Sequence, residues 1–396
     1  MRLFGWLMVL VLFACTVPAV SADAVAPADT TATVAVQESA LPASSTATTP
    51  AEVELGKKTE EQFIKAGYKF VKDEKTIKKL NDMAVKIAPF TERPDVVYQC
   101  KILDIGELNA MATPGGNIYF TKGILAAVES DDELAGVMAH EIAHNSLYHA
   151  KKMMAREARA SILQVASIVA SLYANSDSVS PMQMITMSEL IKQALLNGYS
   201  VEMEIEADQH GVDYLYKLKE YDPIGLYSVI LGFNKIAQGS VEENLGYLKT
   251  HPYSDERKRL IEKHLKDLGI PINLWRVVGF RAQVVPPAED QKGYTVRLGA
   301  VDVVTLTESH TGLDAKSRAT DAADAMNRRI MKDAIQQVDI RIDSQDGRST
   351  IYFRSYPVLT LTTDDAEAAG MSLDALASLA RQNIRDSIWR ETVKRW

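Results

Sequence analysis

The sequence predicts an α+β protein with two folded domains, residues 53–268 and residues 269–396. The first stretch consists mainly of segments with helical periodicity and has two short strand-like runs, so we expect a mainly helical domain with a small sheet. After Gly269 the pattern changes to alternating apolar and polar residues, and one strand–helix order occurs twice there. This predicts a small, duplicated α+β domain at the C-terminal end.

The elements of the first domain follow from the spacing of apolar and turn residues. Residues 162–173 are nearly all apolar, and a buried helix is favoured over a membrane span because Arg156, Arg159 and Gln164 leave too short an apolar window. The predicted strands are 96–103 and 116–121, and the predicted helices are 53–88 with a break near Gly67, 131–150, 152–173, 182–197, 199–219 and 254–267.

The second domain contains an internal sequence repeat. Val303–Thr307 precedes Gly312 and a predicted helix, and Val358–Thr362 precedes Gly370 and a further one. The domain shows no grouping of metal ligands or nucleophiles, so its sequence assigns it no chemistry. Its predicted strands are 294–306, 338–342 and 349–362, and its predicted helices are 314–334 and 372–392.

The amino-terminal residues predict export. Arg2 precedes a short apolar run, and Val20-Ser21-Ala22 is a small-residue cleavage site, so residues 1–22 are expected to be a signal peptide cut after Ala22. The expected location is therefore periplasmic or secreted. Lipid attachment at Cys15 is the less favoured alternative, because the bulky Phe13 makes a poor lipobox. Residues 23–52, rich in Ala, Thr, Ser and Pro, are expected to form a flexible linker.

Charge and cysteine content exclude some classes of protein. The net charge of −8 argues against a nucleic-acid partner. The one compact basic run, Arg257-Lys258-Arg259, is flanked by acidic residues and is interpreted as an ordinary solvated helix face. Cys100 would be the only cysteine left after signal removal, so we expect no internal disulfide and a small buried thiol.

One segment carries a specific chemical signal, His140-Glu141-Ile142-Ala143-His144. Ser130 and Glu133 predict a capping box that starts a helix just before it. On that helix, His140 and His144 share one face and can hold one zinc ion, beside which Glu141 can act as a general base. This pattern arises by chance about once in a hundred chains of this composition. The plainer alternative is an exposed amphipathic helix with two incidental histidines.

A zinc site of this kind needs a third ligand and an open fourth position. Residues 199–219 predict a second helix, on which Glu204 and Asp208 share a face. Glu204 is the candidate third ligand. Asp208 is expected to accept the second ring N–H of a ligand histidine and so to fix its tautomer. Two imidazoles and one carboxylate favour zinc over other metals.

Five segments of the chain carry a family resemblance: Asn109–Gly123, His140–His144, Tyr199–Asp208, Thr250-His251-Pro252 and Glu256-Arg257. In their order and spacing they resemble the gluzincin metallopeptidases of the CaaX-prenyl-protease type, especially their soluble, periplasmic BepA-like branch. The similarity extends over about residues 53–268, so the first domain is expected to have a zincin-type fold. It implies one zinc per chain at His140, His144 and Glu204, with Glu141 as catalytic base and His251 near the metal.

We therefore expect a zinc-dependent endopeptidase of the cell envelope that acts on misfolded or misassembled proteins, with membrane association possible. His251 is expected to be catalytic as a transition-state donor. Alternatively it acts as a latch, which means that it occupies the fourth zinc position and keeps the enzyme latent. A third alternative is that it only packs under the site. Strand 117–121 would offer a free edge to an extended substrate, or is a plain hairpin strand. The rival function is a non-hydrolytic chaperone with a structural zinc.

Overall fold

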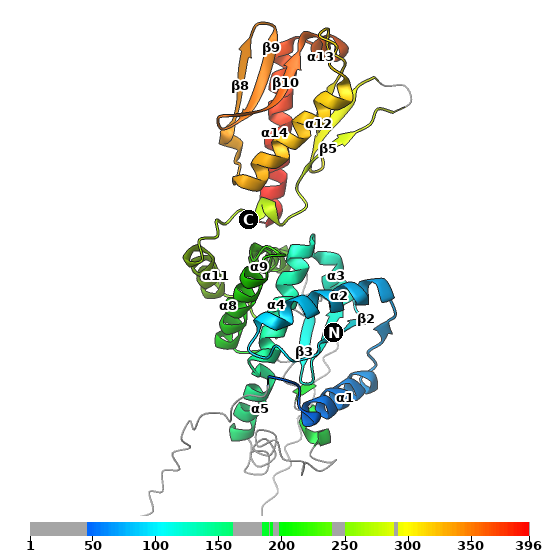
Figure 1. The fold of residues 1–396 in the computed structure, drawn as a ribbon, viewed down its shortest axis with the longest axis vertical. Coiled ribbons are helices and arrows are strands. Elements are labelled where there is room, and N and C mark those ends of the chain that lie inside the picture. Colours follow the sequence, from blue (N-terminus) through cyan, green and yellow to red (C-terminus); the bar gives the residue numbers. More distant parts are fainter. Residues whose placement is uncertain are drawn as a thin grey trace, which may run out of the picture. The chain divides into compact units, whose positions relative to one another are not determined.

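The computed structural model describes residues 46–160, 184–189, 191–192, 198–239, 250–288 and 292–395 (Figure 1). The expected signal peptide, the alternative lipid site at Cys15, residues 23–45 of the expected linker and the apolar stretch 162–173 lie outside these residues. Among the described helices, none combines the length and the apolar character needed to cross a membrane.

The first part of the chain consists of a four-stranded sheet and the helices that surround it (Figure 1). The strands are β1 (Phe70–Val71), β2 (Gln99–Leu103), β3 (Ala110–Thr113) and β4 (Asn117–Thr121), in the order β1-β2-β4-β3. Only the β2–β4 pair is parallel among these four strands. The helices are α1 (Pro50–Lys65), α2 (Glu74–Ile87), η1 (Ala88–Phe90), α3 (Lys122–Ala127), α4 (Asp131–Ser146), α5 (His149–Ala160), α8 (Val201–Leu218), α9 (Ile224–Gly239) and α11 (Asp255–Asp267).

Helix α1 begins before the position predicted for it. Thr49 caps the helix and forms a reciprocal capping box with Glu52, and Pro50 occupies the first turn. The last three residues of the expected linker, 50–52, therefore belong to α1, which corrects the predicted boundary. Composition missed this start because the stabilising groups are a local cap and a buried ion pair between Glu52 and Arg93.

β3, and not β4 as expected, lies at an edge of the sheet, and β1 lies at the other edge. β4 pairs on both sides, with β2 and with β3, so it has no open edge. Gly115 and Gly116, with φ of +87° and +82°, form the turn that joins β3 to β4. Cys100 lies buried in β2, as predicted.

Helix α4 packs against β3 of the sheet on one side and against α8 and α9 on the other. Helix α9 was not predicted, because its apolar residues occur all around it and leave no amphipathic period. The α4–α9 crossing is very close. A Cβ on Gly225 would lie 2.0 Å from the Asp132 carbonyl oxygen, so only glycine fits there. The backbone of α4 is thus held firmly between the two layers.

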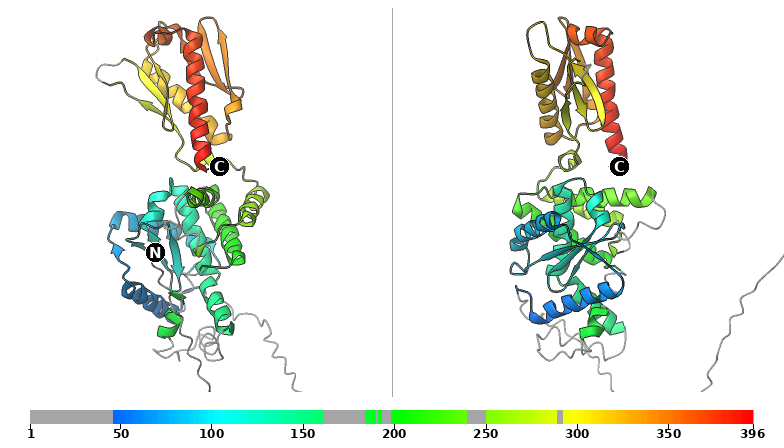
Figure 2. Two further views of the ribbon diagram at one scale, coloured as in Figure 1. Left: turned by 180° about the vertical axis from the view of Figure 1, so that it is seen from behind. Right: turned by 90° about the vertical axis from the view of Figure 1, so that its right-hand side faces the viewer.

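The C-terminal residues form two antiparallel three-stranded sheets, ordered β5-β6-β7 and β10-β9-β8. The predicted strand 294–306 divides at a turn that contains Gly299, and 349–362 divides near Arg354, which has a φ of +58°. The short β5 was not predicted. Helices α12 and α14 each pack against strands of both sheets (Figure 2). The elements are η3 (Leu274–Arg276), β5 (Ala282–Val285), β6 (Tyr294–Leu298), β7 (Val301–Leu306), α12 (Ala315–Lys332), η4 (Gln337–Asp339), β8 (Ile340–Gln345), β9 (Arg348–Phe353), β10 (Tyr356–Thr362), α13 (Thr363–Ala368) and α14 (Leu373–Arg395).

Candidate metal centre

Helix α4 carries His140, Glu141 and His144. Its first turn is capped by the Ser130 hydroxyl, which accepts from the backbone N–H of Glu133 at 3.2 Å. This confirms the cap, but not the reciprocal bond of the predicted capping box, because the Glu133 side chain bonds one residue before Ser130. The Glu133 carboxylate accepts from the Glu129 N–H and from the hydroxyl of Ser228 in α9. The cap therefore also ties α4 to its neighbour. All three side chains of the motif are buried.

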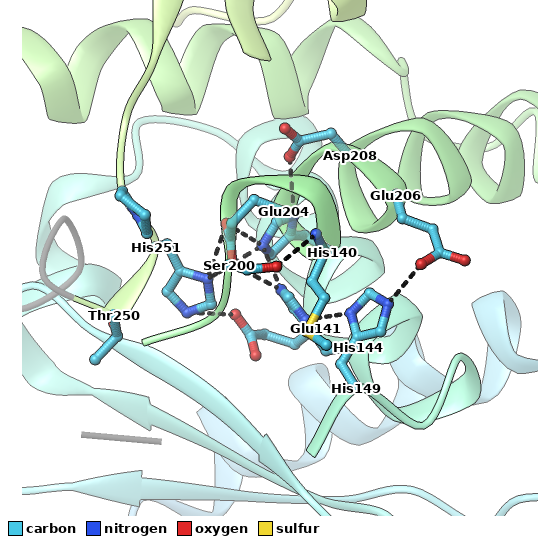
Figure 3. A network of polar contacts seen from close by, with 12 residues as sticks. His140, Glu141, His144, His149, Ser200, Glu204, Glu206, Asp208, Thr250 and His251 are labelled. Atoms are coloured by element: carbon cyan, nitrogen blue, oxygen red, sulfur yellow. Dashed lines mark hydrogen bonds and ion pairs between the residues drawn. The ribbon is translucent and has the colours of Figure 1, made fainter. Parts of the chain in front are cut away.

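Donor atoms from three segments converge on one point (Figure 3). The Nε2 atoms of His140 and His144 lie 3.0 Å apart. The carboxylate of Glu204, from α8, places Oε1 3.2 Å from Nε2 of His144 and Oε2 3.4 Å from Nε2 of His140. His251, from the segment before α11, adds Nδ1 at 3.0 Å from Oε1 of Glu204. The four donor atoms lie within 4.8 Å of one another.

These separations fit a zinc ion. Ligand atoms about 2.0–2.2 Å from a tetrahedral zinc lie about 3.3–3.6 Å from one another, and the observed 3.0–3.4 Å comes within a few tenths of an ångström of that range. Two imidazole nitrogens and a carboxylate oxygen are also the donor set that suits zinc. The cluster can bind one metal ion.

Asp208 lies behind His140, where the sequence predicted an acceptor. Its Oδ1 is 3.0 Å from Nδ1 of His140, on the side of the ring away from the other ligand atoms. Arg257 of α11 makes contacts of 2.8 and 2.9 Å with the two oxygens of Asp208 and of 2.9 Å with Oε2 of Glu204. Arg257 is 1% exposed, so its interpretation as part of a solvated helix face is wrong. Its neighbours in sequence are charged, but its partners come from another helix.

His144 has neighbours that sequence reasoning missed. Its Nδ1 lies 2.8 Å from Nδ1 of His149, whose Nε2 is 3.1 Å from Oε2 of Glu206 (Figure 3). The ring of Tyr199 stacks on that of His144, with centroids 3.9 Å apart and an interplanar angle of 14°. A possible signal was that three of the seven histidines fall within residues 140–149. The spacing of five residues hid the contact, because Tyr148, with a φ of +58°, breaks the helix between them.

The two ligand histidines differ electrostatically. Burial lowers the pKa of His140, but hydrogen bonds to Asp208 and Glu204 outweigh it and raise the pKa to about 10. Burial dominates at His144 and holds its pKa well below the usual value. The Glu204 carboxyl is also buried, yet the charges of His251 and Arg257 hold its pKa far below the ordinary range. Glu204 is thus ionised and ready to bind a cation.

Glu141 lies beside the cluster and is completely buried. Its Oε1 is 3.5 Å from Nε2 of His251. Burial raises the pKa of this carboxyl. Nε2 of His251 is also 3.4 Å from the carbonyl oxygen of Ala110 in β3. The structure therefore brings together all the residues that the sequence singled out for the site.

Comparison with known proteins shows that the part of the chain that contains this cluster is similar to metallopeptidases. The chain is 29% identical over 176 residues to the mitochondrial metalloendopeptidase OMA1 of Schizosaccharomyces pombe, which covers 44% of this chain and 49% of that protein. It is 28% identical over 174 residues to the metalloprotease LoiP of Escherichia coli, covering 44% and 63%. It is 22% identical over 213 residues to the beta-barrel assembly-enhancing protease of Escherichia coli, covering 54% and 43%.

The chain thus spans about half the length of these curated relatives. Residues 295–391 match a domain of unknown function, DUF8459. Residues 72–265 match the model of peptidase family M48 and contain every residue of the cluster described above. This part of the chain belongs to the M48 family of zinc metallopeptidases.

Proposed function

We propose that this protein is a zinc-dependent endopeptidase that cleaves peptide bonds in misfolded or misassembled proteins of the cell envelope. The observation that carries the proposal is the convergence of His140, His144 and Glu204, with the buried Glu141 beside them. A structural zinc site would need no buried base next to its ligands. This distinguishes the proposal from the alternative, a non-hydrolytic chaperone that uses zinc as a structural post.

In this mechanism His140 and His144, through Nε2, and the Glu204 carboxylate would hold the zinc, which supplies Lewis acidity that makes a water reactive near neutral pH. Glu141 takes the proton from the attacking water and passes it to the leaving amine nitrogen. Burial raises the pKa of Glu141, which favours its holding the proton between these two transfers. Asp208 fixes the ring of His140 through Nδ1, and Arg257 balances the charge of Asp208.

His251 can take either of two roles in this mechanism. Its Nδ1 lies among the ligand atoms, 3.0 Å from Glu204 and 3.3 Å from Nε2 of His140, which supports a latch on the fourth metal position. As a transition-state donor, it would instead have to direct a ring N–H towards the substrate oxygen. We favour the latch, because these two distances place the ring in the ligand cluster.

The outer edge of β3, on the side away from β4, is the proposed binding site for an extended substrate. Asn109 pairs with Thr121 of β4 through its carbonyl oxygen, and in an antiparallel ladder the residues next to such a pair direct their backbone groups outward. Ala110 and Ala112 therefore direct their backbone groups away from β4, and the Ala110 carbonyl oxygen lies 3.4 Å from Nε2 of His251. A peptide added there would be recognised by its backbone, which favours broad specificity for unfolded segments.

The remaining assignments rest on sequence patterns and similarity. We propose that the chain is exported through residues 1–22 and that its peptidase part belongs to the BepA-like branch of the CaaX-prenyl-protease type. We also propose a domain boundary near residue 268, followed by a duplicated strand–helix unit. The order β5-β6-β7-α12 followed by β8-β9-β10 and α14 supports the duplication.

The deciding experiment compares the wild type with Glu141→Gln. Glutamine keeps the shape of the side chain but is not a base, so cleavage of casein should be abolished while one zinc per chain and the melting temperature are retained. Zinc content is measured by atomic absorption. Cleavage at a near wild-type rate by the variant would refute the role of Glu141 as base. A wild type that binds zinc but does not cleave casein would instead favour the chaperone alternative.

A further inference from the structure

His149 and Glu206 form a chain of contacts that ends on a proposed metal ligand, and the mechanism above gives neither of them a role. His149 is completely buried at the start of α5, and Glu206 lies on α8, two residues after the third ligand. The contacts run from Nδ1 of His144 to Nδ1 of His149 at 2.8 Å and from Nε2 of His149 to Oε2 of Glu206 at 3.1 Å. Figure 3 shows the ring of His149 between the other two side chains.

The positions of the protons follow from this geometry. Nε2 of His144 faces the ligand cluster, so a bound zinc requires the ring proton of His144 to be on Nδ1. That N–H needs an acceptor, and Nδ1 of His149 lies at hydrogen-bonding distance. His149 must then carry its own proton on Nε2, which faces the Glu206 carboxylate. Each bond thus dictates the tautomer of the next ring.

We propose that His149 is a positioning residue for the metal centre, which accepts the Nδ1 hydrogen of His144 and is itself fixed in the required tautomer by Glu206. The inference rests on the proposed zinc site and deepens it, because it adds a second orienting group. The two ligand histidines would then be held differently. His140 donates to the carboxylate of Asp208, whose charge is balanced by Arg257, whereas His144 donates to a neutral ring.

The geometry also indicates which of the two residues should affect the metal centre more when it is substituted. His149 is enclosed, so loss of its acceptor would leave the Nδ1–H of His144 buried and without a hydrogen bond. The side chain of Glu206 is 41% exposed and is also 3.3 Å from the ammonium group of Lys152. Water can replace part of its role, so substitutions at Glu206 should have smaller effects than substitutions at His149.

The test uses the full-length protein and pairs of variants that separate hydrogen bonding from packing. His149→Asn places an amide oxygen near the position of Nδ1 and can still accept, whereas His149→Leu cannot. Glu206→Gln and Glu206→Leu form the matching pair, and Glu202→Leu removes the same charge from an exposed position of the same helix. The measured quantity is the dissociation constant for zinc, obtained by competition with a chromophoric chelator. The visible absorption spectrum of the cobalt-loaded protein reports the ligand geometry.

We expect zinc affinity to fall about 10- to 100-fold in His149→Leu and about threefold or less in His149→Asn, with a changed cobalt spectrum only in the former. Glu206→Leu should bind zinc more weakly than both Glu206→Gln and Glu202→Leu. Equal affinities for His149→Leu and wild type, or equal losses in His149→Leu and His149→Asn, would overturn the proposal. If His149→Leu fails to fold, the Glu206 pair decides. A wild-type chain without stoichiometric zinc would instead refute the underlying metal site.

Discussion

Arg257 and Asp208 form a buried ion pair from two helices, with contacts of 2.8 Å from Nε and 2.9 Å from Nη2 to the two carboxylate oxygens. Both side chains are 1% exposed, and the pair lies directly behind His140. The same guanidinium reaches Glu204 and the carbonyl oxygens of His251 and Pro252. One side chain therefore connects the proposed third ligand, an orienting group and the segment that carries His251.

Removal of this guanidinium should strongly destabilise the folded protein. Arg257→Leu would leave the Asp208 and Glu204 carboxylates buried without their counterion, and breaking such a pair typically costs about 3–5 kcal/mol. The free energy of unfolding, measured with urea in the presence of a chelator, should fall by about that amount. Arg259→Leu, an exposed neighbour in the same basic run, is the matched control and should change stability by less than about 0.5 kcal/mol. Similar losses in both variants would show that Arg257 has no special role.

Substitution of the proposed third ligand, Glu204, should weaken zinc binding more than substitution of Asp208. Glu204→Ala leaves two histidines, which form too weak a site, so the variant should lose its metal outright after dialysis against a mild chelator. Asp208→Ala keeps all three ligands and should weaken zinc binding about 10- to 100-fold. Zinc content by atomic absorption and a competition titration measure the two effects. Stoichiometric zinc in Glu204→Ala would rule out Glu204 as third ligand.

His251→Ala separates the possible roles of this histidine by the sign of its effect. A latch that holds the fourth position nine tenths of the time would, when removed, raise the turnover of an unfolded substrate about tenfold. A transition-state donor would instead lower it about 10²- to 10³-fold, and a packing residue would leave it unchanged. We expect the increase. Tyr253→Phe, which alters the same segment at a hydroxyl that contacts Asp255, should not change turnover.

The pair of His210 and Glu92 should make stability depend on pH. The hydrogen bond to Glu92 raises the pKa of His210 above 6.5. Glu92 is partly buried, which alone would raise its pKa, but hydrogen bonds from His210 and Tyr214 lower it from 4.5 to about 2. The His210 contribution is complete below pH 6.5 and is lost as pH rises through its folded-state pKa. The Glu92 contribution is complete above pH 4.5 and is lost as pH falls towards 2.

The stabilisation by this pair should therefore be largest between about pH 4.5 and 6.5. The measurement is the difference in free energy of unfolding between wild type and His210→Gln, from urea titrations with chelator at pH 5.5 and pH 9. The difference should shrink at pH 9. A difference that does not change with pH would show that the pair is not charged in the folded protein.

Local patterns sufficed for much of the site. Ligand spacing along two helices led to His140, His144, Glu204 and Asp208, because residues four apart share a helix face whatever surrounds it. The role of Arg257 was misinterpreted, since its solvent exposure depends on where α11 packs. His149 was missed because the chain breaks at Tyr148, so helical spacing no longer applies.

The fold, like the site, could be predicted only in part from local sequence patterns. The pairing of β4 could not be read from its residues, because alternation within a strand does not reveal how many neighbours it has. β3 is four residues long, and its residues are buried throughout, so it lacks the alternation of a half-exposed strand. The apolar helix α9 was missed for a similar reason. Elements buried on all sides lack the periodicity on which sequence reasoning depends.

The glycine contacts around α4 have a consequence for the metal centre. Gly225 lets α9 approach one side of α4, and on α8 a Cβ at Gly211 would lie 3.3 Å from the backbone nitrogen of His140. The spacing between the helix that carries the histidines and the helix that carries Glu204 is therefore set by backbone contact. The ligand side chains on such a frame can follow an ion of different radius only by rotating about their own bonds. The distance between the ligand-bearing helices is then a property of the main chain, and a methyl group added at Gly211 would press against the backbone of α4 at His140.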